Sequence, residues 1–265
     1  MKPTISILNY IISSYRLFAV LATLIGLVLL TINLRKNKVD MKKILLLFIP
    51  LILFFFLGAR FFNVFLNPKA YETISFFKLD FAGLSIYGGL IGALIAISLW
   101  TFIFKIPLWE SLDACVFPAG IAFILARIGC FLNGCCGGKI TSSKLGIIYP
   151  HLKDLPKPFS LPVWPTQLFE LFATLLILTL LVFINNKKIK LPSGSKFLVF
   201  SFLFSLARLL ILPYRRLPYS NIIVNWLYPG FYLFFIILSL TLFIYRMIKH
   251  NESEQIQRNN IEDRN

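Results

Sequence analysis

Three arginines interrupt apolar runs of the chain, and each could bind an anion at membrane depth. Arg60, Arg127 and Arg208 are each preceded by mostly apolar residues. A charged side chain inside a membrane is costly and usually faces a bundle interior or a wet cavity. A guanidinium group can bind a phosphate through two nitrogens at once, so we predict that the three arginines share one anionic ligand, most simply a lipid phosphate. The alternatives are snorkelling to the interface and a buried structural ion pair.

A glycine-rich stretch follows Arg127 and holds three of the four cysteines in the chain. Residues 126–139 read ARIGCFLNGCCGGK. Irregular backbone at membrane depth is tolerated only where protein or water satisfies its polar groups, so this stretch predicts the floor of a polar cavity. If the helix continues past Arg127, Cys130 lies about one turn further along the same face.

The cysteines Cys130, Cys135 and Cys136 allow several interpretations. The spacing Cys-x4-Cys-Cys is not a good zinc pattern and no histidine is close in sequence, so we predict no metal site. A disulfide bond is possible, and so is inert packing of small apolar side chains. The positive charge of Arg127 favours a thiolate beside it, so we expect at least one reactive thiol here and an inert Cys115 in the fourth span.

Two further short patterns lie at the start of apolar runs. Tyr87-Gly88-Gly89 lies in the third run, where small residues let helices approach closely; a kink that faces a substrate is the alternative. Gln167 and Glu170 are three residues apart near the start of the fifth run and share a helix face. A glutamate just inside an apolar span is a candidate functional residue.

The composition is that of a polytopic membrane protein. Hydrophobic residues make up 58% of the 265 residues and charged residues only 14%, whereas soluble domains have about 25% charged residues. The net charge of +16 could indicate a nucleic-acid partner, but the lysines and arginines lie in short clusters between apolar runs, as in cytoplasmic loops. We therefore predict an all-α bundle of about seven membrane helices and no nucleic-acid binding.

Seven apolar runs are long enough to span a bilayer, which takes about 20 residues. They cover approximately residues 12–34, 44–66, 84–104, 112 into the glycine-rich stretch, 166–184, 197–212 and 222–244. The two most basic loops are the first and the fifth, which makes their common side cytoplasmic. We expect the N-terminus outside and the C-terminus in the cytoplasm, with a transmembrane domain at 1–250 and a disordered polar tail at 251–265.

Taken together, these residues resemble the prolipoprotein diacylglyceryl transferases of bacterial inner membranes. The resemblance is collinear and covers most of the chain, from Tyr15 to the seventh run. The matching motifs are Gly-Ala-Arg at 58–60, Tyr-Gly-Gly-Leu-Ile-Gly at 87–92, Arg-x-Gly-x-Phe-x-Asn-Gly at 127–134, Pro-Thr-Gln-Leu-Phe-Glu at 165–170 and Ala-Arg at 207–208. Each motif alone is weak, but their order and spacing are fairly specific.

The resemblance implies transfer of a diacylglyceryl group from phosphatidylglycerol to the lipobox cysteine thiol of a prolipoprotein, with glycerol phosphate leaving. It implies no metal or cofactor, and its partners are phosphatidylglycerol, the prolipoprotein signal peptide and membrane lipids. Arg127 and Arg208 match positions that hold the lipid phosphate, and Tyr87 would orient the headgroup. The expected substrate-binding residues are Tyr15, Arg60, Gly88, Gly89, Cys130, Asn133, Cys135, Gly138, Gln167 and Glu170.

The chain departs from this family where protons are handled. Tyr87 replaces a histidine of the family, Cys130 an asparagine, Cys135 a glutamate and Leu212 an acid. Tyrosine, with a pKa of about 10, takes a thiol proton at neutral pH far less readily than histidine at about 6.5. Two further functions therefore stay open: a membrane thiol or redox enzyme that uses the cysteines, and a lipid-binding or transport protein that keeps only the arginines.

Overall fold

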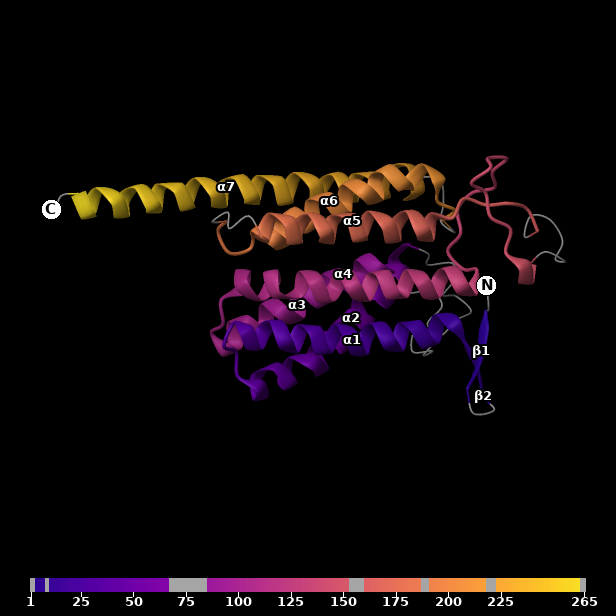
Figure 1. Cartoon of the computed structure of the whole chain (residues 1–265), viewed down its shortest axis with the longest axis horizontal. Coiled ribbons are helices and arrows are strands. Elements are labelled where there is room, and N and C mark those ends of the chain that lie inside the picture. The colour runs from indigo at the N-terminus through magenta and orange to yellow at the C-terminus, as the bar shows by residue number, and fades with distance from the viewer. Residues whose placement is uncertain are drawn as a thin grey trace.

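The computed structural model describes residues 3–7, 10–66, 85–152, 160–186, 191–217 and 223–262. Within these residues it is a bundle of long helices with one β-hairpin (Figure 1). The helices are α1 (Ser14–Lys36), α2 (Met41–Leu66), α3 (Ile86–Phe104), α4 (Leu108–Asn133), α5 (Thr166–Asn186), α6 (Ser195–Ile211) and α7 (Tyr228–Glu262). Seven segments are long and apolar enough to cross a membrane, which confirms the predicted all-α membrane bundle.

A β-hairpin precedes the first helix and was not predicted. β1 (Thr4–Ile7) and β2 (Tyr10–Ser13) are antiparallel and pair from one end to the other. The hairpin takes the first residues of the expected first span, and α1 begins where the Ser13 hydroxyl accepts a hydrogen bond from the Arg16 backbone N–H. The first span is therefore shifted by about two residues relative to its apolar run.

The last helix is longer than its apolar run. α7 continues through residues 251–262, which we expected to be disordered. This stretch has no proline or glycine and contains glutamate, glutamine and arginine, which favour helix, so the helix propagates beyond the apolar part. The division of the chain into a domain at 1–250 and a separate tail stays a prediction.

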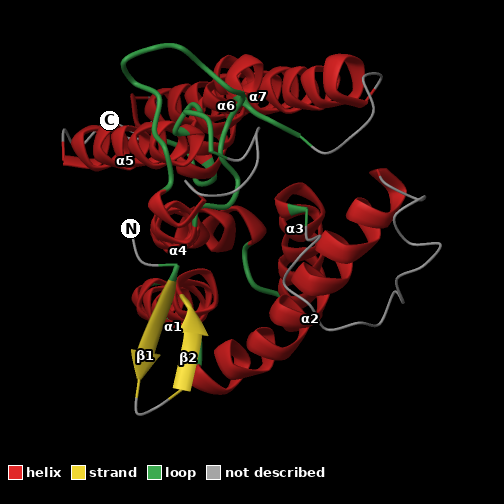
Figure 2. Cartoon of the chain, turned by 90° about the vertical axis from the view of Figure 1, so that its right-hand side faces the viewer, coloured by secondary structure: helices red, strands yellow, loops and turns green. Residues whose placement is uncertain are grey.

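α4 lies at the centre of the bundle and contacts α1, α3, α5 and α6. Figure 2 shows it between α1 on one side and α5 and α6 on the other, with the pair α2 and α3 beside it. The N-terminus and the segments at 134–152 and 160–165 lie at one end of the bundle, which we call the loop end; the C-terminus lies at the other (Figure 1). Because α4 ends and α5 begins at the loop end, the motifs that flank this connection meet there.

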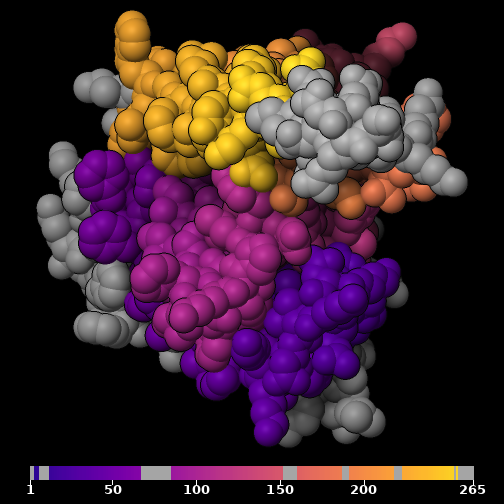
Figure 3. Space-filling model, turned by 90° about the vertical axis from the view of Figure 1, so that its left-hand side faces the viewer, coloured from indigo at the N-terminus to yellow at the C-terminus, as the bar shows by residue number. Residues whose placement is uncertain are grey.

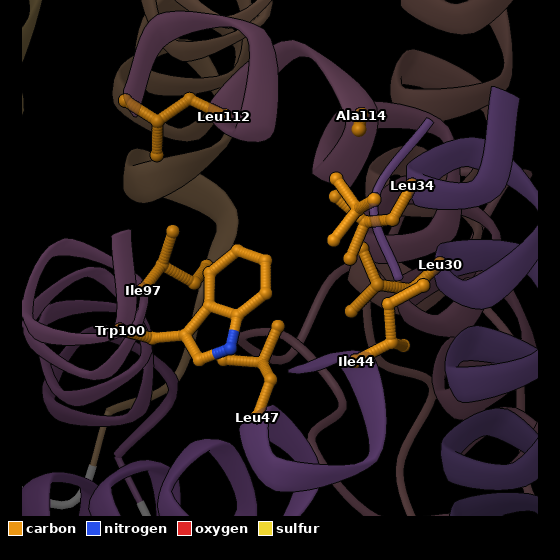
Figure 4. Packing of buried hydrophobic residues seen from close by; sticks show 9 residues of the cluster. Leu30, Leu34, Ile44, Leu47, Ile97, Trp100, Leu112 and Ala114 are labelled. Carbon is orange, nitrogen blue, oxygen red and sulfur yellow. The ribbon is translucent and has the colours of Figure 1, made fainter. Parts of the chain in front are cut away.

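An apolar cluster fixes four helices at the end opposite the loop end. Eight of its nine members come in pairs from successive helices: Leu30 and Leu34, Ile44 and Leu47, Ile97 and Trp100, Leu112 and Ala114 (Figure 4). The ninth, Val39, lies between α1 and α2. The Trp100 indole N–H also donates to the carbonyl of Lys43 at 2.8 Å, which ties α3 to the start of α2. Figure 3 shows this end of the molecule, with the indigo to magenta part of the chain packed below the yellow α7.

Glycines bring α2 and α3 into backbone contact. A Cβ added at Gly88 would overlap the carbonyl oxygen of Gly58, and one at Gly92 would overlap another α2 carbonyl. A Cβ at Gly89 would lie 2.7 Å from the ring of Phe55. Because α3 is continuous here and these glycines face α2, their contacts favour the helix-packing interpretation. The expected contact of Gly88 and Gly89 with substrate stays a prediction.

Candidate active site

The carboxylate of Glu170 is the centre of a buried cluster of charges. It lies near the start of α5, and only 3% of the residue is exposed. Arg127 Nε lies 2.8 Å from one carboxylate oxygen, Arg215 Nη1 lies 2.9 Å from the other, and Arg208 Nη1 contacts that same oxygen. Three guanidinium groups against one carboxylate leave two positive charges unbalanced in a buried place. We call these four residues the arginine cluster.

The arginine cluster keeps hydrogen-bonding capacity in reserve. Arg127 Nε and Arg215 Nη1 are at ion-pair distance from Glu170, yet neither is aligned with the carboxylate as a hydrogen bond, and the carboxylate oxygen that faces Arg127 also lacks one. Buried polar groups are hydrogen-bonded in the large majority of cases. A further acceptor of negative charge therefore fits this cluster, and phosphate oxygens suit the planar guanidinium donors.

Tyr87 orients Arg208. Its hydroxyl oxygen accepts a hydrogen bond from Arg208 Nε at 2.9 Å, and the guanidinium carbon lies 5.3 Å from the centre of the ring. The ring is packed in turn against Tyr228, Phe231 and Tyr232 of α7, with ring centroids 5.2 to 6.2 Å apart. This setting suits a residue that holds an arginine in place, rather than one that takes a proton from a thiol.

Arg215 is the functional candidate that the sequence analysis missed. It follows the short turn η3 (Leu212–Tyr214), beyond the apolar run of α6. An isolated antiparallel β-bridge pairs Arg215 with Gly138 and so places the Arg215 side chain against Glu170. Its spacing of seven residues from Arg208, about two helical turns, was the available signal. Arg60 is buried on α2, 7% exposed, and its expected part in ligand binding stays a prediction.

Gly138 lets the loop approach Arg215. Its backbone N–H donates to the carbonyl of Trp164 at 2.8 Å, and the next N–H donates to the carbonyl of Tyr214 at 2.8 Å. A Cβ at Gly138 would overlap the Tyr214 carbonyl and lie 2.7 Å from Trp164 Cβ. These contacts give Gly138 a packing role that positions Arg215, and its expected contact with substrate stays a prediction.

We predict that Gly138→Ala destabilises the protein by about 1–3 kcal/mol, because backbone atoms on both sides cannot give way. Gly137→Ala is the matched control, since its added Cβ would first meet the end of the Val163 side chain at 3.3 Å. Thermal unfolding in detergent measures both variants. Equal midpoints for the two alanine variants would contradict the packing role.

The three cysteines of the glycine-rich stretch meet in space. The sulfur atoms of Cys130, Cys135 and Cys136 all lie within 4.8 Å of one another, and all three thiols are free. α4 ends at Gly134 with a φ of 72°, and Cys136 also has a positive φ of 61°. These two left-handed residues turn the chain back over the end of α4. Cys130 is buried and Cys136 is exposed, so this cysteine cluster opens at the loop end.

Two buried side chains at the start of α5 hold the cysteine turn. Thr166 Oγ1 donates to the carbonyl of Cys136 at 3.1 Å, and Gln167 Nε2 donates to that of Cys135 at 2.6 Å. Each residue is only 1% exposed. Gln167 also donates to the hydroxyl of Tyr149 at 2.7 Å, while its own carbonyl oxygen is buried without a hydrogen bond. The contacts of Gln167 therefore position Cys135, and its expected contact with substrate stays a prediction.

Three more predicted residues lie around the same cluster. Arg127 Nη1 is 4.0 Å from the Cys130 sulfur, which joins the cysteine and arginine clusters. The half-buried Tyr15, in the first turn of α1, interacts electrostatically with the three thiols and with Arg127. The Asn133 side chain hydrogen-bonds with Cys135. The structure thus brings these residues together at the loop end.

The pKa values of the two cysteines beyond α4 move in opposite directions. Hydrogen bonds from the thiols of Cys130 and Cys135, and the charges of Arg127 and Arg215, lower the pKa of Cys136 well below its usual value. Solvent at this exposed side chain limits the size of the shift but not its direction. The bond with Cys130 lowers the pKa of Cys135, but the bond with Cys136 and burial outweigh it and raise this pKa to about 11.

We predict that Cys136 is the reactive thiol of the chain. Alkylation requires the thiolate, so Cys136 should label rapidly at pH 7, whereas labelling of Cys135 should increase as the pH rises towards 11. Cys115 lies within α4 and should label slowly throughout. The protein is first treated with a reductant and a chelator, which are then removed. It is labelled with iodoacetamide at a series of pH values, and mass spectrometry measures the labelling of each cysteine. Equal rates for Cys136 and Cys115 at pH 7 would contradict this assignment.

An apolar cavity of about 140 Å³ lies beside Tyr87. It lies between α3, α4, α6 and α7, and its walls include Leu94, Val116, Phe204 and Phe235. Tyr87, which holds Arg208, forms part of the same wall. An alkyl chain suits such a cavity, because apolar surface is buried on entry.

Comparison with known proteins gives a consistent result. Residues 3–247 match the family model described as prolipoprotein diacylglyceryl transferase. A phosphatidylglycerol–prolipoprotein diacylglyceryl transferase 2 of Clostridium perfringens is 34% identical over 141 residues, 53% of each chain. A transferase of Dehalococcoides mccartyi is 33% identical over 129 residues, 49% of this chain and 48% of its own. One of Ehrlichia ruminantium is 28% identical over 206 residues, 74% of this chain and 77% of its own. The chain spans about half the length of the first two of these relatives.

Proposed function

Because the chain belongs to the prolipoprotein diacylglyceryl transferase family, we propose that it transfers a diacylglyceryl group from phosphatidylglycerol to the lipobox cysteine thiol of a prolipoprotein. The observation that carries this proposal is the arginine cluster with its two unbalanced positive charges. A phosphodiester brings the negative charge and the acceptor oxygens that this cluster lacks. Glycerol phosphate is then the leaving group.

The arginine cluster acts on the leaving group. When the bond between the glycerol carbon and the phosphate oxygen breaks, the negative charge on the phosphate grows, and Arg127, Arg208 and Arg215 stabilise that growing charge. Glu170 keeps the three guanidinium groups at their positions, and Tyr87 holds Arg208. An acyl chain of the lipid occupies the apolar cavity beside Tyr87.

The loop end faces the outside of the inner membrane in this proposal. The outer surface of the helices is apolar enough for lipid, with Phe102 84% exposed and Leu176 71% exposed. We predict that reporter fusions after Lys43 and after Lys188 report the cytoplasm, because basic loops stay inside. A fusion near Asp154 should report the outside. An external signal after Lys188 would overturn this orientation.

A reconstituted assay tests the function itself. The full chain is placed in vesicles of phosphatidylglycerol with a signal peptide that carries a lipobox cysteine. The expected result is a peptide that gains the mass of one diacylglyceryl group, with none gained by a peptide whose cysteine is replaced by serine or in vesicles of phosphatidylcholine. Lipid binding without any modified peptide would instead indicate a non-catalytic lipid-binding protein, and would overturn the proposal.

A further inference from the structure

The cysteine cluster has the form of a metal site. We propose that Cys130, Cys135 and Cys136 bind one zinc ion through three thiolates, and that the fourth coordination position accepts the thiol of the prolipoprotein. The identity of this incoming thiol rests on the proposed function. The metal site itself is argued from the geometry of the chain alone.

The distances between the sulfur atoms suit a single cation. Three atoms that lie within 4.8 Å of one another share a point no more than about 2.8 Å from each of them. Zinc–thiolate bonds measure about 2.3 Å, so side-chain movements of about 0.5 Å complete the first shell. Thiolate ligands select soft or borderline ions such as zinc, and they disfavour magnesium and calcium.

The backbone is held in the conformation that brings these thiols together. Cys136 has a left-handed φ, which is strained for a residue with a Cβ and marks a position that its surroundings impose. Its carbonyl and that of Cys135 are fixed by Thr166 and Gln167, both almost fully buried. A ligand site needs its donors fixed in advance, and these contacts fix the two cysteines.

The donor set leaves one position open. Within the described parts of the chain, the group that meets here has three thiols and no histidine or carboxylate. Structural zinc sites have four protein ligands, whereas catalytic sites have three and an exchangeable position. Cys136 is exposed at the loop end, so an external thiol can reach that position without crossing the bundle.

The charges around the cysteine cluster balance when zinc and the lipid phosphodiester are both bound. Zinc with three thiolates carries one negative charge, and Arg127 lies 4.0 Å from the Cys130 sulfur. The arginine cluster has two unbalanced positive charges. Before the incoming thiol binds, one is matched by the zinc–thiolate group and the other by the lipid phosphodiester, so this state of the site is close to neutral. The incoming thiolate then adds one negative charge, which is lost when its sulfur bonds to the glycerol carbon.

This site replaces the missing base. The incoming thiol binds the zinc in place of water and releases its proton to solvent, because the metal favours the thiolate form. The thiolate sulfur then attacks the glycerol carbon that carries the phosphate ester. The carbon–sulfur bond forms as the carbon–oxygen bond breaks, and glycerol phosphate leaves with both electrons of that bond. Neither an oxidant nor a reductant takes part.

Metal titration of the full chain tests the site. Reduced protein in detergent is stripped with a chelator and titrated with zinc against a chelating indicator. We expect about one zinc per chain, and an affinity at least about tenfold lower in Cys130→Ser, Cys135→Ser and Cys136→Ser. Cys115→Ser is the matched control and should keep the affinity. Cobalt in place of zinc should show thiolate charge-transfer absorption, and a peptide with one cysteine should change that spectrum, whereas its serine counterpart should not.

The outcomes separate this inference from the proposed function. Zinc that does not bind, or that binds equally well after all three cysteines are replaced by serine, overturns the metal site. A cobalt spectrum that does not change when the cysteine peptide is added overturns the claim that the fourth coordination position is open to a thiol. Full transfer by metal-free protein overturns the metal step and leaves the proposed function in place. Zinc binding with the spectral response but without transfer supports the site and counts against the proposed function.

Discussion

Arg215→Lys is expected to lower the rate of diacylglyceryl transfer at least about 100-fold, the effect of losing a donor to a developing negative charge. Lysine keeps the charge but offers no planar fork, so it cannot serve Glu170 and a phosphate together. The neighbouring Arg216→Lys is the matched control, because Arg216 is exposed while Arg215 Nη1 is buried 2.9 Å from Glu170. We expect Arg216→Lys to stay within about twofold of the unmodified chain.

The measurement is the initial rate of peptide modification in phosphatidylglycerol vesicles, at several lipid fractions. Arg127→Lys and Arg208→Lys should behave like Arg215→Lys, since all three arginines contact the same carboxylate. Unfolding midpoints of the lysine variants should stay near that of the unmodified chain. If Arg215→Lys and Arg216→Lys transfer at equal rates, Arg215 has no place in the site.

Glu170→Gln is expected to destabilise the protein by about 3–5 kcal/mol, the cost of leaving buried charges without their partner. Three guanidinium groups would then face one another around a neutral amide. Glu110→Gln is the control, because Glu110 is exposed in the first turn of α4. Thermal unfolding in detergent provides the comparison.

A second readout separates charge balance from loss of fold. Added phosphatidylglycerol should raise the unfolding midpoint of Glu170→Gln more than that of the unmodified chain, because the lipid phosphate supplies the missing negative charge. Phosphatidylcholine, whose headgroup has no net charge, should not. If Glu170→Gln unfolds at the same temperature as Glu110→Gln, the carboxylate does not hold the arginines together.

The membrane architecture could be predicted from the sequence, and so could the importance of three members of the arginine cluster, although not that they pair with one another. Apolar runs define spans because every backbone polar group in lipid must be satisfied within a helix. Arg127, Arg208 and Glu170 stood out because charges inside such runs require a reason. Arg215 could not be found this way, since it lies beyond the run and reaches Glu170 only through the η3 turn and the bridge to Gly138.

The cysteine cluster shows a second limit of linear spacing. The Cys-x4-Cys-Cys pattern argued against a metal, yet the sulfur atoms converge. The reason is the left-handed conformation at Gly134 and Cys136, which folds the chain back over the end of α4. A glycine predicts such a conformation, but a cysteine does not, so the reversal at Cys136 was hidden in the sequence.

The backbone contact between α2 and α3 has a consequence for the mutational tolerance of this protein. Gly58, Gly88 and Gly92 each admit no side chain, because even a methyl group would overlap the facing backbone. In a saturation-mutagenesis survey these positions would be as intolerant as the arginines around Glu170. Selection for activity alone would rank all of them together as essential. Only the arginine variants would still fold. Sorting the same library by protein abundance at the membrane, without selection for activity, would therefore separate the arginines, which are needed for chemistry, from the glycines, which are needed for packing.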